Sequence, residues 1–211
     1  MSSQAPTQPV AGAPPRRSSI RGLLLSSVLM VVVLTVLLGV VYPLVMTGLA
    51  QVFFHDQANG SLVKDNQGQV VGSKLIGQSF TKPQYFHGRA SAAGNGYDAT
   101  SSGGTNLGPT SKTLLKNTVA LANKIRQENG LPPNYPLPSD AVSTSASGLD
   151  PDISPAYAAL QVPRVARARG LSQATVRALV KKAASDRMLG FMGQPRVNVL
   201  ELNMALDGLK R

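Results

Sequence analysis

The sequence predicts an α+β protein with a single N-terminal transmembrane helix followed by one extracytoplasmic domain that has several helices and a few short strands. Two observations predict this class: a long uncharged apolar run near the N-terminus, and a following region in which helical patterns outnumber clear strands. We expect residues 1–21 to be a disordered cytoplasmic tail, residues 22–50 the transmembrane helix and residues 51–211 the extracytoplasmic domain. A region of that last length can bury one modest core.

The apolar run from Gly22 to Ala50 contains 29 residues and no charged side chain. About 20 apolar residues are enough for a helix to cross a bilayer. The ring of Pro43 would clash with the carbonyl of Gly39, so we expect a kink near this pair. A cleaved signal peptide is the alternative, because Gly48-Leu49-Ala50 has a small-x-small pattern. The apolar region of a signal peptide is only about 7–15 residues long, so an uncleaved anchor is favoured.

The flanks of the apolar run predict its orientation. Arg16, Arg17 and Arg21 lie just before it, whereas Gln51–Asn59, just after it, contains no lysine or arginine. Positively charged flanks stay in the cytoplasm. We therefore expect the N-terminus inside the cell and residues 51–211 outside the cytoplasm. Residues 1–19 are rich in Pro, Ser, Ala and Gln and are expected to be disordered.

Composition excludes several functional classes. The chain has no cysteine, which rules out disulfides, thiolate zinc sites, thiol nucleophiles and lipoprotein acylation. Its net charge of +11 suits nucleic acid, anionic lipid or an acidic protein partner. There is no tryptophan to supply a base-stacking surface. A nucleic-acid partner is not expected, because it conflicts with the predicted location and no recognised motif is present.

Four helices are predicted from capping residues and apolar periodicity. One starts at Thr110 or Ser111 and ends at Gly130, with a face formed by Leu114, Thr118, Leu121 and Ile125. A second starts at Ser154, has Pro155 in its first turn and is expected to be interrupted at Pro163. The third follows Ser172 and contains Val176, Leu179, Val180 and Ala183. The last follows Asn198, with Glu201 completing a capping box and Val199, Leu202 and Leu206 as its buried stripe.

The rest of the domain is predicted to be mostly irregular. Val70-Val71 and Leu75-Ile76 are brief apolar pairs that indicate short strands or irregular structure. Residues 86–110 are rich in glycine, serine, threonine and asparagine and predict a long loop, and loops of that length are usually functional or disordered. The proline-rich residues 131–138 are expected to form a stiff connector.

A glycine-rich run at residues 102–113 invites comparison with a phosphate-binding loop. Gly103 and Gly108 have the required spacing, and a predicted helix follows. Pro109, however, occupies the position of the lysine that would reach the phosphates, and it also removes an amide donor. The alternative interpretation is a glycine-rich turn that packs closely against a partner.

His87 lies in the run Tyr85-Phe86-His87-Gly88-Arg89. A catalytic histidine would need an orienting carboxylate and a nucleophile, for which Asp98 and several serines are available, although nothing in the sequence pairs them. Aromatic residues beside an arginine are typical of an interface. We therefore expect a structural or interface role. Asp150 and Asp152 flank a proline and are interpreted as turn residues or as charges near the N-terminus of a neighbouring helix, not as an acid–base pair.

A basic run follows in the C-terminal third of the chain. It contains few acidic residues and is interpreted as a solvated helical face or, alternatively, as a surface for anionic lipid or acidic partner loops: Arg164, Arg167, Arg169, Arg177, Lys181, Lys182 and Arg187.

These residues lie in runs that resemble the C subunit of the Kdp potassium-transporting P-type ATPase. The matching runs are VYPL (41–44), QANGSL (57–62), LIGQSF (75–80), YFHGR (85–89), SGGTNLGP (102–109), SASGLDPDISPAYAALQVPRVARARGL (145–171) and GQPRVNVLELNMALD (193–207). They cover most of the chain from the apolar run onward. The N-terminal tail is longer than is usual in that family, and residues 141–144 depart from its pattern.

The resemblance implies a non-catalytic accessory subunit of a potassium uptake complex in the bacterial inner membrane. Its partners would be a potassium-channel-like subunit, an ATP-hydrolysing subunit and a small single-span subunit, together with membrane lipid. The family is described as a catalytic chaperone that raises the ATP affinity of the hydrolysing subunit. This chain would have no cofactor of its own, and ATP would be bound only jointly with that subunit.

The resemblance also suggests site residues. Ser102, Gly103 and Gly104 are similar to part of a transporter ATPase signature and are candidate nucleotide or anion contacts. The candidates for partner contact are Gln78, Tyr85, Phe86, His87, Arg89, Asn106, Gln161 and Arg164. No catalytic or metal-binding residue is expected. Two other functions stay open: a membrane-anchored hydrolase that uses a serine, His87 and Asp98, and an anchored module that binds cell-envelope polymers.

Overall fold

The computed structural model describes residues 19–209, and the chain divides into two units between Ala58 and Asn59. The predicted tail, residues 1–21, falls almost wholly outside the described residues. Within the described part, Ser19 caps the first helix and Ile20 already belongs to it.

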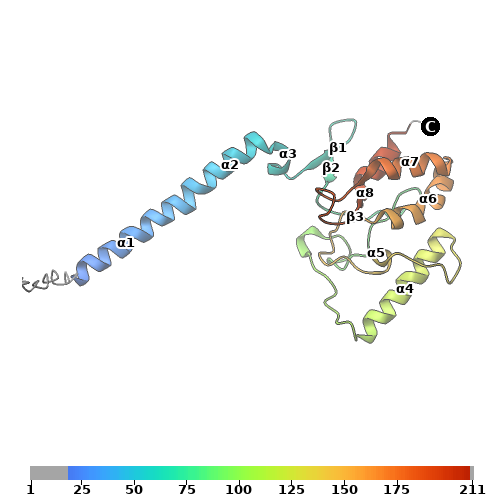
Figure 1. Ribbon diagram of the computed structural model, residues 1–211, viewed down its shortest axis with the longest axis horizontal. Helices are drawn as coiled ribbons and strands as arrows, with labels where there is room; N and C mark the ends of the chain where they lie inside the picture. The colour runs from blue at the N-terminus through green and yellow to red at the C-terminus, as the bar shows by residue number, and fades with distance from the viewer. Residues whose placement is uncertain (1–18, 210–211) are drawn as a thin grey trace, which may run out of the picture. The chain divides into compact units, whose positions relative to one another are not determined.

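The first unit contains one long apolar helix (Figure 1). It consists of α1 (Ile20–Val36), a π-helical segment η1 (Leu37–Val41) and α2 (Tyr42–Phe53), and a short helix α3 (His55–Ala58) follows. This continuous helix of 34 residues contains an 18-residue window with a mean hydropathy of 2.9 and is long enough to cross a membrane. The helix predicted for residues 22–50 therefore extends a little further at both ends.

The irregularity expected near Gly39 and Pro43 appears as a π turn. The amide of Tyr42 bonds to the carbonyl of Leu37, five residues earlier, where a regular helix would use a residue four positions back. Pro43 has no amide hydrogen for the carbonyl of Gly39. The hydrogen-bond pattern thus changes at the predicted place while the helix continues.

The second unit is a small α+β domain, as the sequence predicts. It begins with a hairpin of β1 (Leu62–Lys64) and β2 (Val70–Ser73), and an antiparallel sheet of order β3-β5-β4 lies nearer the C-terminus. The predicted loop at residues 86–110 holds only the short 3-10 turn η2. The remaining elements are η2 (Ala99–Ser101), α4 (Lys112–Asn129), α5 (Ser139–Val142), β3 (Asp152–Ile153), α6 (Pro155–Arg169), α7 (Gln173–Ala183), β4 (Ala184–Ser185), β5 (Arg196–Asn198) and α8 (Val199–Asp207).

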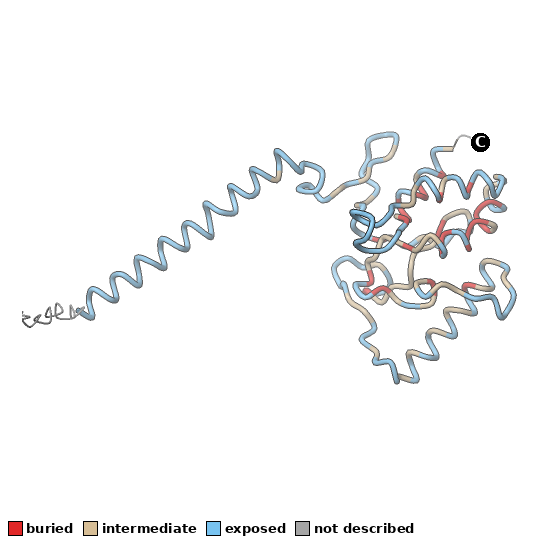
Figure 2. The backbone as a smooth tube through the Cα atoms, viewed as in Figure 1, coloured by how far each residue is buried: buried red, intermediate tan, exposed pale blue. Residues whose placement is uncertain are grey.

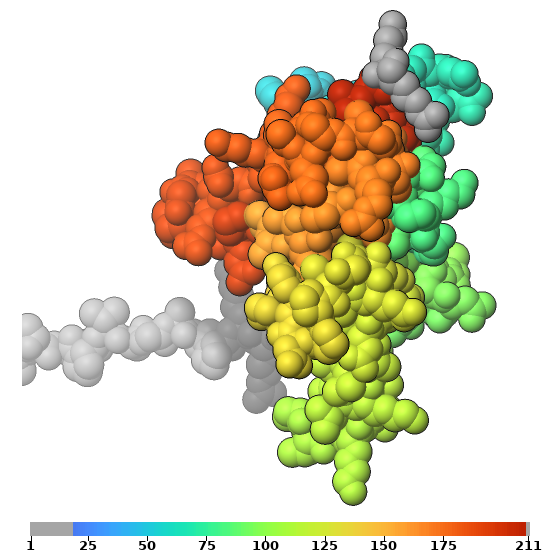
Figure 3. Space-filling view, turned by 90° about the vertical axis from the view of Figure 1, so that its right-hand side faces the viewer, coloured from blue at the N-terminus to red at the C-terminus, as the bar shows by residue number. Residues whose placement is uncertain are grey.

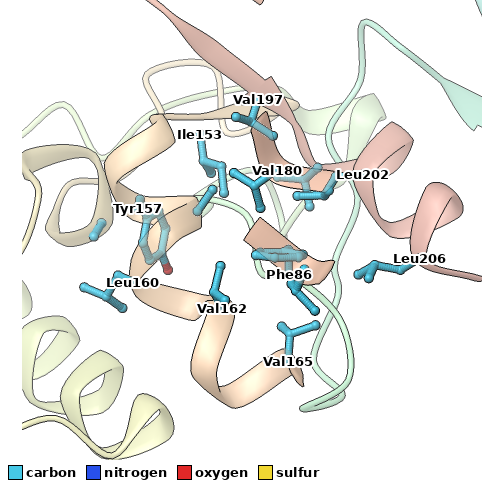
Figure 4. Close-up of a cluster of buried hydrophobic side chains, with 14 of the residues drawn as sticks. Phe86, Ile153, Tyr157, Leu160, Val162, Val165, Val180, Val197, Leu202 and Leu206 are labelled. Atoms are coloured by element: carbon cyan, nitrogen blue, oxygen red, sulfur yellow. The ribbon is translucent and has the colours of Figure 1, made fainter. Parts of the chain in front are cut away.

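The core of the domain is built around α6 (Figures 2 and 4). Val162 and Val165 of this helix are fully buried and pack in one cluster with Phe86, Leu202 and Val176. The buried stripe predicted for α8 is confirmed, with Leu202 at 0% exposure, and α7 buries Val176 and Val180 while Leu179 and Ala183 are half-buried. Three other parts of the chain, the segment around Phe86, α7 and α8, therefore pack against α6.

The predicted helix starts are confirmed by their caps. The side chains of Ser111, Ser154, Ser172 and Asn198 each accept a hydrogen bond from the amide three residues on. Gly130 ends α4 with φ of 64°, as a left-handed cap requires. The carboxylate of Glu201, expected in a capping box, lies 2.9 Å from Nζ of Lys74.

One prediction about local structure is wrong. Pro163 does not interrupt its helix, because α6 continues from Pro155 to Arg169 with eight buried residues, and their packing outweighs a proline cost of about 3 kcal/mol. Asp152 forms the short strand β3 with Ile153, which pairs with Asn198 and Val197 of β5, and it lies three residues before the start of α6.

Candidate functional site

The best-connected polar site of the domain lies where residues 83–89 cross α6. Arg164, on α6, donates from Nη1 to the carbonyls of Pro83 and Tyr85, at 2.6 and 3.0 Å. Its Nη2 donates to Oε1 of Gln161 at 2.7 Å, and its Nε donates to Oδ1 of Asn129 at 3.0 Å. Burial of the guanidinium lowers the pKa of Arg164, while the charge of Glu128 opposes that shift.

Two side-chain amides hold the backbone of Phe86 and His87. Oε1 of Gln161 accepts from the His87 amide at 2.8 Å, and Nε2 donates to the His87 carbonyl at 3.0 Å. Asn203, on α8, does the same for Phe86, at 2.8 and 3.0 Å. We call Gln161, Arg164 and Asn203 the polar clasp. It satisfies backbone groups of the crossing segment that no strand partners.

The His87 ring lies against this clasp. Its Nε2 lies 3.1 Å from the Lys82 carbonyl and 3.5 Å from Nη1 of Arg164, and its Nδ1 lies 3.5 Å from Oε2 of Glu128. Burial and the charge of Arg164 lower the pKa of His87 below 6.5, although the Lys82 carbonyl and Glu128 oppose this. The neutral ring is therefore favoured around neutral pH.

Arg89, at the C-terminal end of residues 83–89, binds residues 143–150 of the domain. It donates to Oδ2 of Asp150 at 2.8 Å, to Oγ of Ser143 at 3.1 Å and to the Thr144 carbonyl at 3.3 Å. Its Nε is buried without a hydrogen-bond partner. The hydroxyl of Tyr97 donates to the Arg89 carbonyl at 2.6 Å, and burial raises the pKa of Tyr97 to about 12.

A cleft of about 250 Å³ opens beside these residues. Its lining includes both charges, Arg89 and Lys124 as well as Glu128, and the aromatic side chain of Tyr97. Within residues 19–209, no group of three or more acidic, histidine or cysteine side chains could hold a metal ion. The cleft therefore offers polar contacts for a partner, without a recognisable metal centre.

Arg169 connects Gln84 and Tyr85 to the C-terminal helix α8. The guanidinium of Arg169 lies 5.1 Å from the ring centroid of Tyr85 and donates to Oδ1 of Asp207 at 2.7 Å. It also donates to the Gln84 carbonyl at 2.8 Å. Two members of the predicted basic run, Arg164 and Arg169, thus have internal partners, while Arg167 and Arg177 are exposed.

The candidate nucleotide contacts pack against residues 146–148 of the same domain. Ser102 Oγ and the Gly103 amide both donate to the Ser147 carbonyl, each at 2.9 Å. A Cβ at Gly104 would lie 2.7 Å from the carbonyl oxygen of Ala146. The glycines therefore permit a close approach within the chain, and the Gly103 amide already has an acceptor.

The predicted partner contacts fall into two groups. Phe86, Gln161 and Arg164 are at most 8% exposed and their hydrogen bonds and packing hold the domain together, so little of their side-chain surface faces a partner. The other candidates keep accessible surface: Gln78, Tyr85, His87, Arg89 and Asn106. Of these, Gln78 donates to the Val71 carbonyl at 2.8 Å and fixes the first hairpin.

The carboxylate beside His87 is Glu128, not the Asp98 considered for a hydrolase. Asp98 accepts hydrogen bonds from the amide and hydroxyl of Thr100, at 2.9 and 2.7 Å. Glu128, Asn129 and Asn203 belong to the site but stand in no pattern that singled them out. Glu128 follows Ile125 by three residues and so lies on the predicted face of α4, which was the available signal.

The fold and the site together define a class of protein: a small α+β domain attached to one apolar, membrane-length helix, with a built-in polar clasp. The chain belongs to the KdpC family, whose model is described as "K+-transporting ATPase, c chain" and matches residues 24–208.

Curated relatives cover nearly the whole chain. A potassium-transporting ATPase KdpC subunit of Koribacter versatilis is 57% identical over 186 residues, which is 88% of this chain and 94% of the relative. That of Caulobacter vibrioides is 58% identical over 173 residues, covering 82% and 86% of the two chains. That of Mycobacterium tuberculosis is 52% identical over 186 residues, covering 88% and 98%.

Proposed function

We propose that this chain is a non-catalytic accessory subunit of a potassium-transporting ATPase, and that its domain lies outside the cytoplasm and caps a channel-like subunit near the ion entrance. The polar clasp is the observation that carries the proposal. It fixes a surface segment at three successive backbone positions while Tyr85, His87 and Arg89 keep accessible side-chain surface. A segment held this firmly suits recognition of a partner, since little flexibility is lost on binding.

The proposed assembly has three other subunits: the channel-like subunit, an ATP-hydrolysing subunit that carries out phosphoryl transfer, and a small single-span subunit. The span would contact them through small residues, because small side chains let helices approach closely in a membrane. Ser27 already bonds within its helix to the Leu23 carbonyl at 2.8 Å, whereas a Cβ at Gly39 would meet nothing within 4 Å. Gly39 is thus the better candidate for close packing with a partner helix.

An effect of this chain on ATP affinity would have to pass through its partners. A domain outside the cytoplasm is separated by the bilayer from cytoplasmic ATP. In addition, the hydrogen bonds of Ser102 and Gly103 to Ser147 leave those groups engaged. We therefore propose indirect coupling through the ATP-hydrolysing subunit, with any shared nucleotide contact made elsewhere on the assembled complex.

The test uses a chain that ends after Ala58, the boundary between the two units. It is coexpressed with the three partner subunits in cells that lack their own copy. We expect the partners to copurify less completely and potassium uptake at low external potassium to be lost. The matched control deletes residues 2–15 and keeps the span and the domain. Normal assembly and uptake with the truncated chain would defeat the proposal.

Copurification also separates the proposal from its two alternatives. An envelope-binding module or a hydrolase should leave detergent extracts without the partner subunits. The hydrolase lacks support from the site, because the Nδ1 side of the His87 ring faces Glu128 and its Nε2 side faces the Lys82 carbonyl and Arg164. Such a histidine is positioned by its neighbours and does not contact a serine nucleophile.

A further inference from the structure

The hairpin between β4 and β5 carries an ordered apolar tip. Residues 187–192 fold back on themselves, with the Gly190 amide bonded to the Arg187 carbonyl at 3.1 Å and the Met192 amide to the Met188 carbonyl at 2.9 Å. Leu189 adopts the left-handed conformation with φ of 53°. This conformation is unusual for a non-glycine residue. The backbone bonds give the tip a defined shape.

The tip displays large apolar side chains to solvent. Met188, Leu189, Phe191 and Met192 are between 49% and 78% exposed. In Figure 3, the orange-red atoms of this part of the chain form a lobe that projects from the domain. A group of exposed apolar side chains in a soluble domain marks a site that binds protein or lipid. Folding the domain leaves this surface uncovered.

Positive charge surrounds the tip. Lys181 and Lys182, at the end of α7, and Arg187, at the base of the tip, are exposed, and Asp186 is the acidic residue between them. Apolar side chains flanked by lysine and arginine are typical of segments that lie in the interface of a bilayer with anionic lipids. If the tip instead bound a hydrophobic pocket on a protein, the surrounding positive charges would have no necessary role.

The chain also keeps the domain close to lipid. Eight residues, 54–61, separate the end of α2 from the start of β1. Fully extended, they reach about 28 Å at most. A domain of 153 residues has a radius of gyration of about 15 Å. The tether is therefore no longer than the domain is wide, and the domain surface stays within reach of the bilayer.

We propose that residues 187–192 insert into the interfacial region of the bilayer, and that Lys181, Lys182 and Arg187 contact anionic lipid headgroups. The inserted tip is a second attachment to the membrane, in addition to the span. It would limit rotation of the domain about its short tether and so fix the direction in which the clasped segment faces. The proposal needs the span to be retained but does not depend on which partner subunit the domain caps.

The absence of tryptophan makes a direct test possible. The full chain carrying Phe191→Trp is reconstituted into phosphatidylcholine–phosphatidylglycerol vesicles, with and without brominated acyl chains. We expect emission shifted to shorter wavelength and loss of most of its intensity when the lipids are brominated. The matched control is Tyr135→Trp, an exposed aromatic position on the proline-rich connector, which should emit as in water and keep its intensity.

The outcomes separate lipid from protein contact. Adding Lys181→Glu and Lys182→Glu to Phe191→Trp should reduce the quenching in anionic vesicles, and circular dichroism should show unchanged helix content. Unquenched emission from Phe191→Trp, or equal quenching at both reporter positions, would overturn the proposal. In the assembled complex, a blue shift without bromine quenching would place the tip against a protein subunit and would also overturn it.

Discussion

At the residue scale, side chains take over hydrogen bonding that a strand would normally supply. Gln161 and Asn203 each give one donor and one acceptor to consecutive backbone positions. A buried amide or carbonyl without a partner is costly, so these side chains allow a non-regular surface segment to pack its backbone against α6 and α8. Arg164 adds two further bonds to carbonyls of the same segment. The geometry of the candidate site therefore depends on the clasp.

The clasp predicts a large loss of stability for Asn203→Leu. The substitution leaves the amide and carbonyl of Phe86 buried without partners, and we expect it to lower the free energy of unfolding by about 2–4 kcal/mol. Thermal unfolding of the full chain in detergent measures the shift in midpoint. The matched control is Asn123→Leu, on the exposed side of α4, which should change the midpoint little. Equal midpoints for the two variants would contradict the role of the clasp.

His87 predicts a pH dependence of stability. Its pKa is lowered from 6.5 in the folded domain, so the unfolded chain binds more protons just below pH 6.5. The free energy of unfolding therefore rises with pH through this interval, and the contribution is lost as the pH falls. We expect His87→Asn to show a smaller drop in unfolding midpoint than the parent between about pH 7.5 and about pH 5.5. The variant His55→Asn, on α3, should keep the parental drop.

At the scale of elements, helix starts follow local chemistry, but helix continuity does not. Each cap is a short polar side chain that bonds to an amide three residues away, and no tertiary contact is needed to make it. Pro163 is different. It destabilises the helix locally by removing one backbone hydrogen bond, and the burial of Val162 and Val165 against other elements offsets that loss. Tertiary packing decides whether a proline ends a helix.

The continuity of α6 predicts that Pro163→Ala is stabilising. Alanine restores an amide donor inside the helix and removes the ring clash, so we expect the free energy of unfolding to rise by about 1–3 kcal/mol. The matched control is Pro155→Ala at the first turn of the same helix, where proline is already favourable and the change should be near zero or slightly destabilising. A lower midpoint for Pro163→Ala would contradict this reasoning and indicate that the ring packs in the core.

At the scale of the whole molecule, a short tether connects a membrane-length helix to a domain with its own core. The core cluster consists of residues after Asn59, so the domain does not need the span to bury its apolar side chains. The span, in turn, is exposed throughout and requires an apolar environment. The domain buries its apolar side chains in its own core, whereas the span needs a membrane to cover its apolar surface.

Orientation in the membrane is a prediction from charge, and the absence of cysteine allows it to be tested. Single-cysteine variants Ser3→Cys and Ser101→Cys are exposed to a membrane-impermeant maleimide in spheroplasts. We expect labelling at residue 101 in intact spheroplasts and at residue 3 only after the membrane is opened. The opposite pattern would place the domain beside cytoplasmic ATP, and a mature chain that begins at Gln51 would show that the span is removed.

The sequence alone determined the features whose causes are local. An uncharged run of 29 residues defines the span, and cap residues with apolar periodicity define α4, α7 and α8. Similarity of whole runs to a known family predicted the family correctly, because such runs preserve both core and surface. These inferences need no knowledge of which distant segments meet.

Only the tertiary structure decided which residues form the site. His87 meets Glu128, and Phe86 meets Asn203, across separations of 41 and 117 residues that no periodicity encodes. Burial likewise distinguishes the clasp residue Gln161 from the accessible Arg89, although both lie in family-like runs. The reason is physical: a polar side chain acquires its role from the unsatisfied group brought next to it, and the packing of the whole domain determines which group that is.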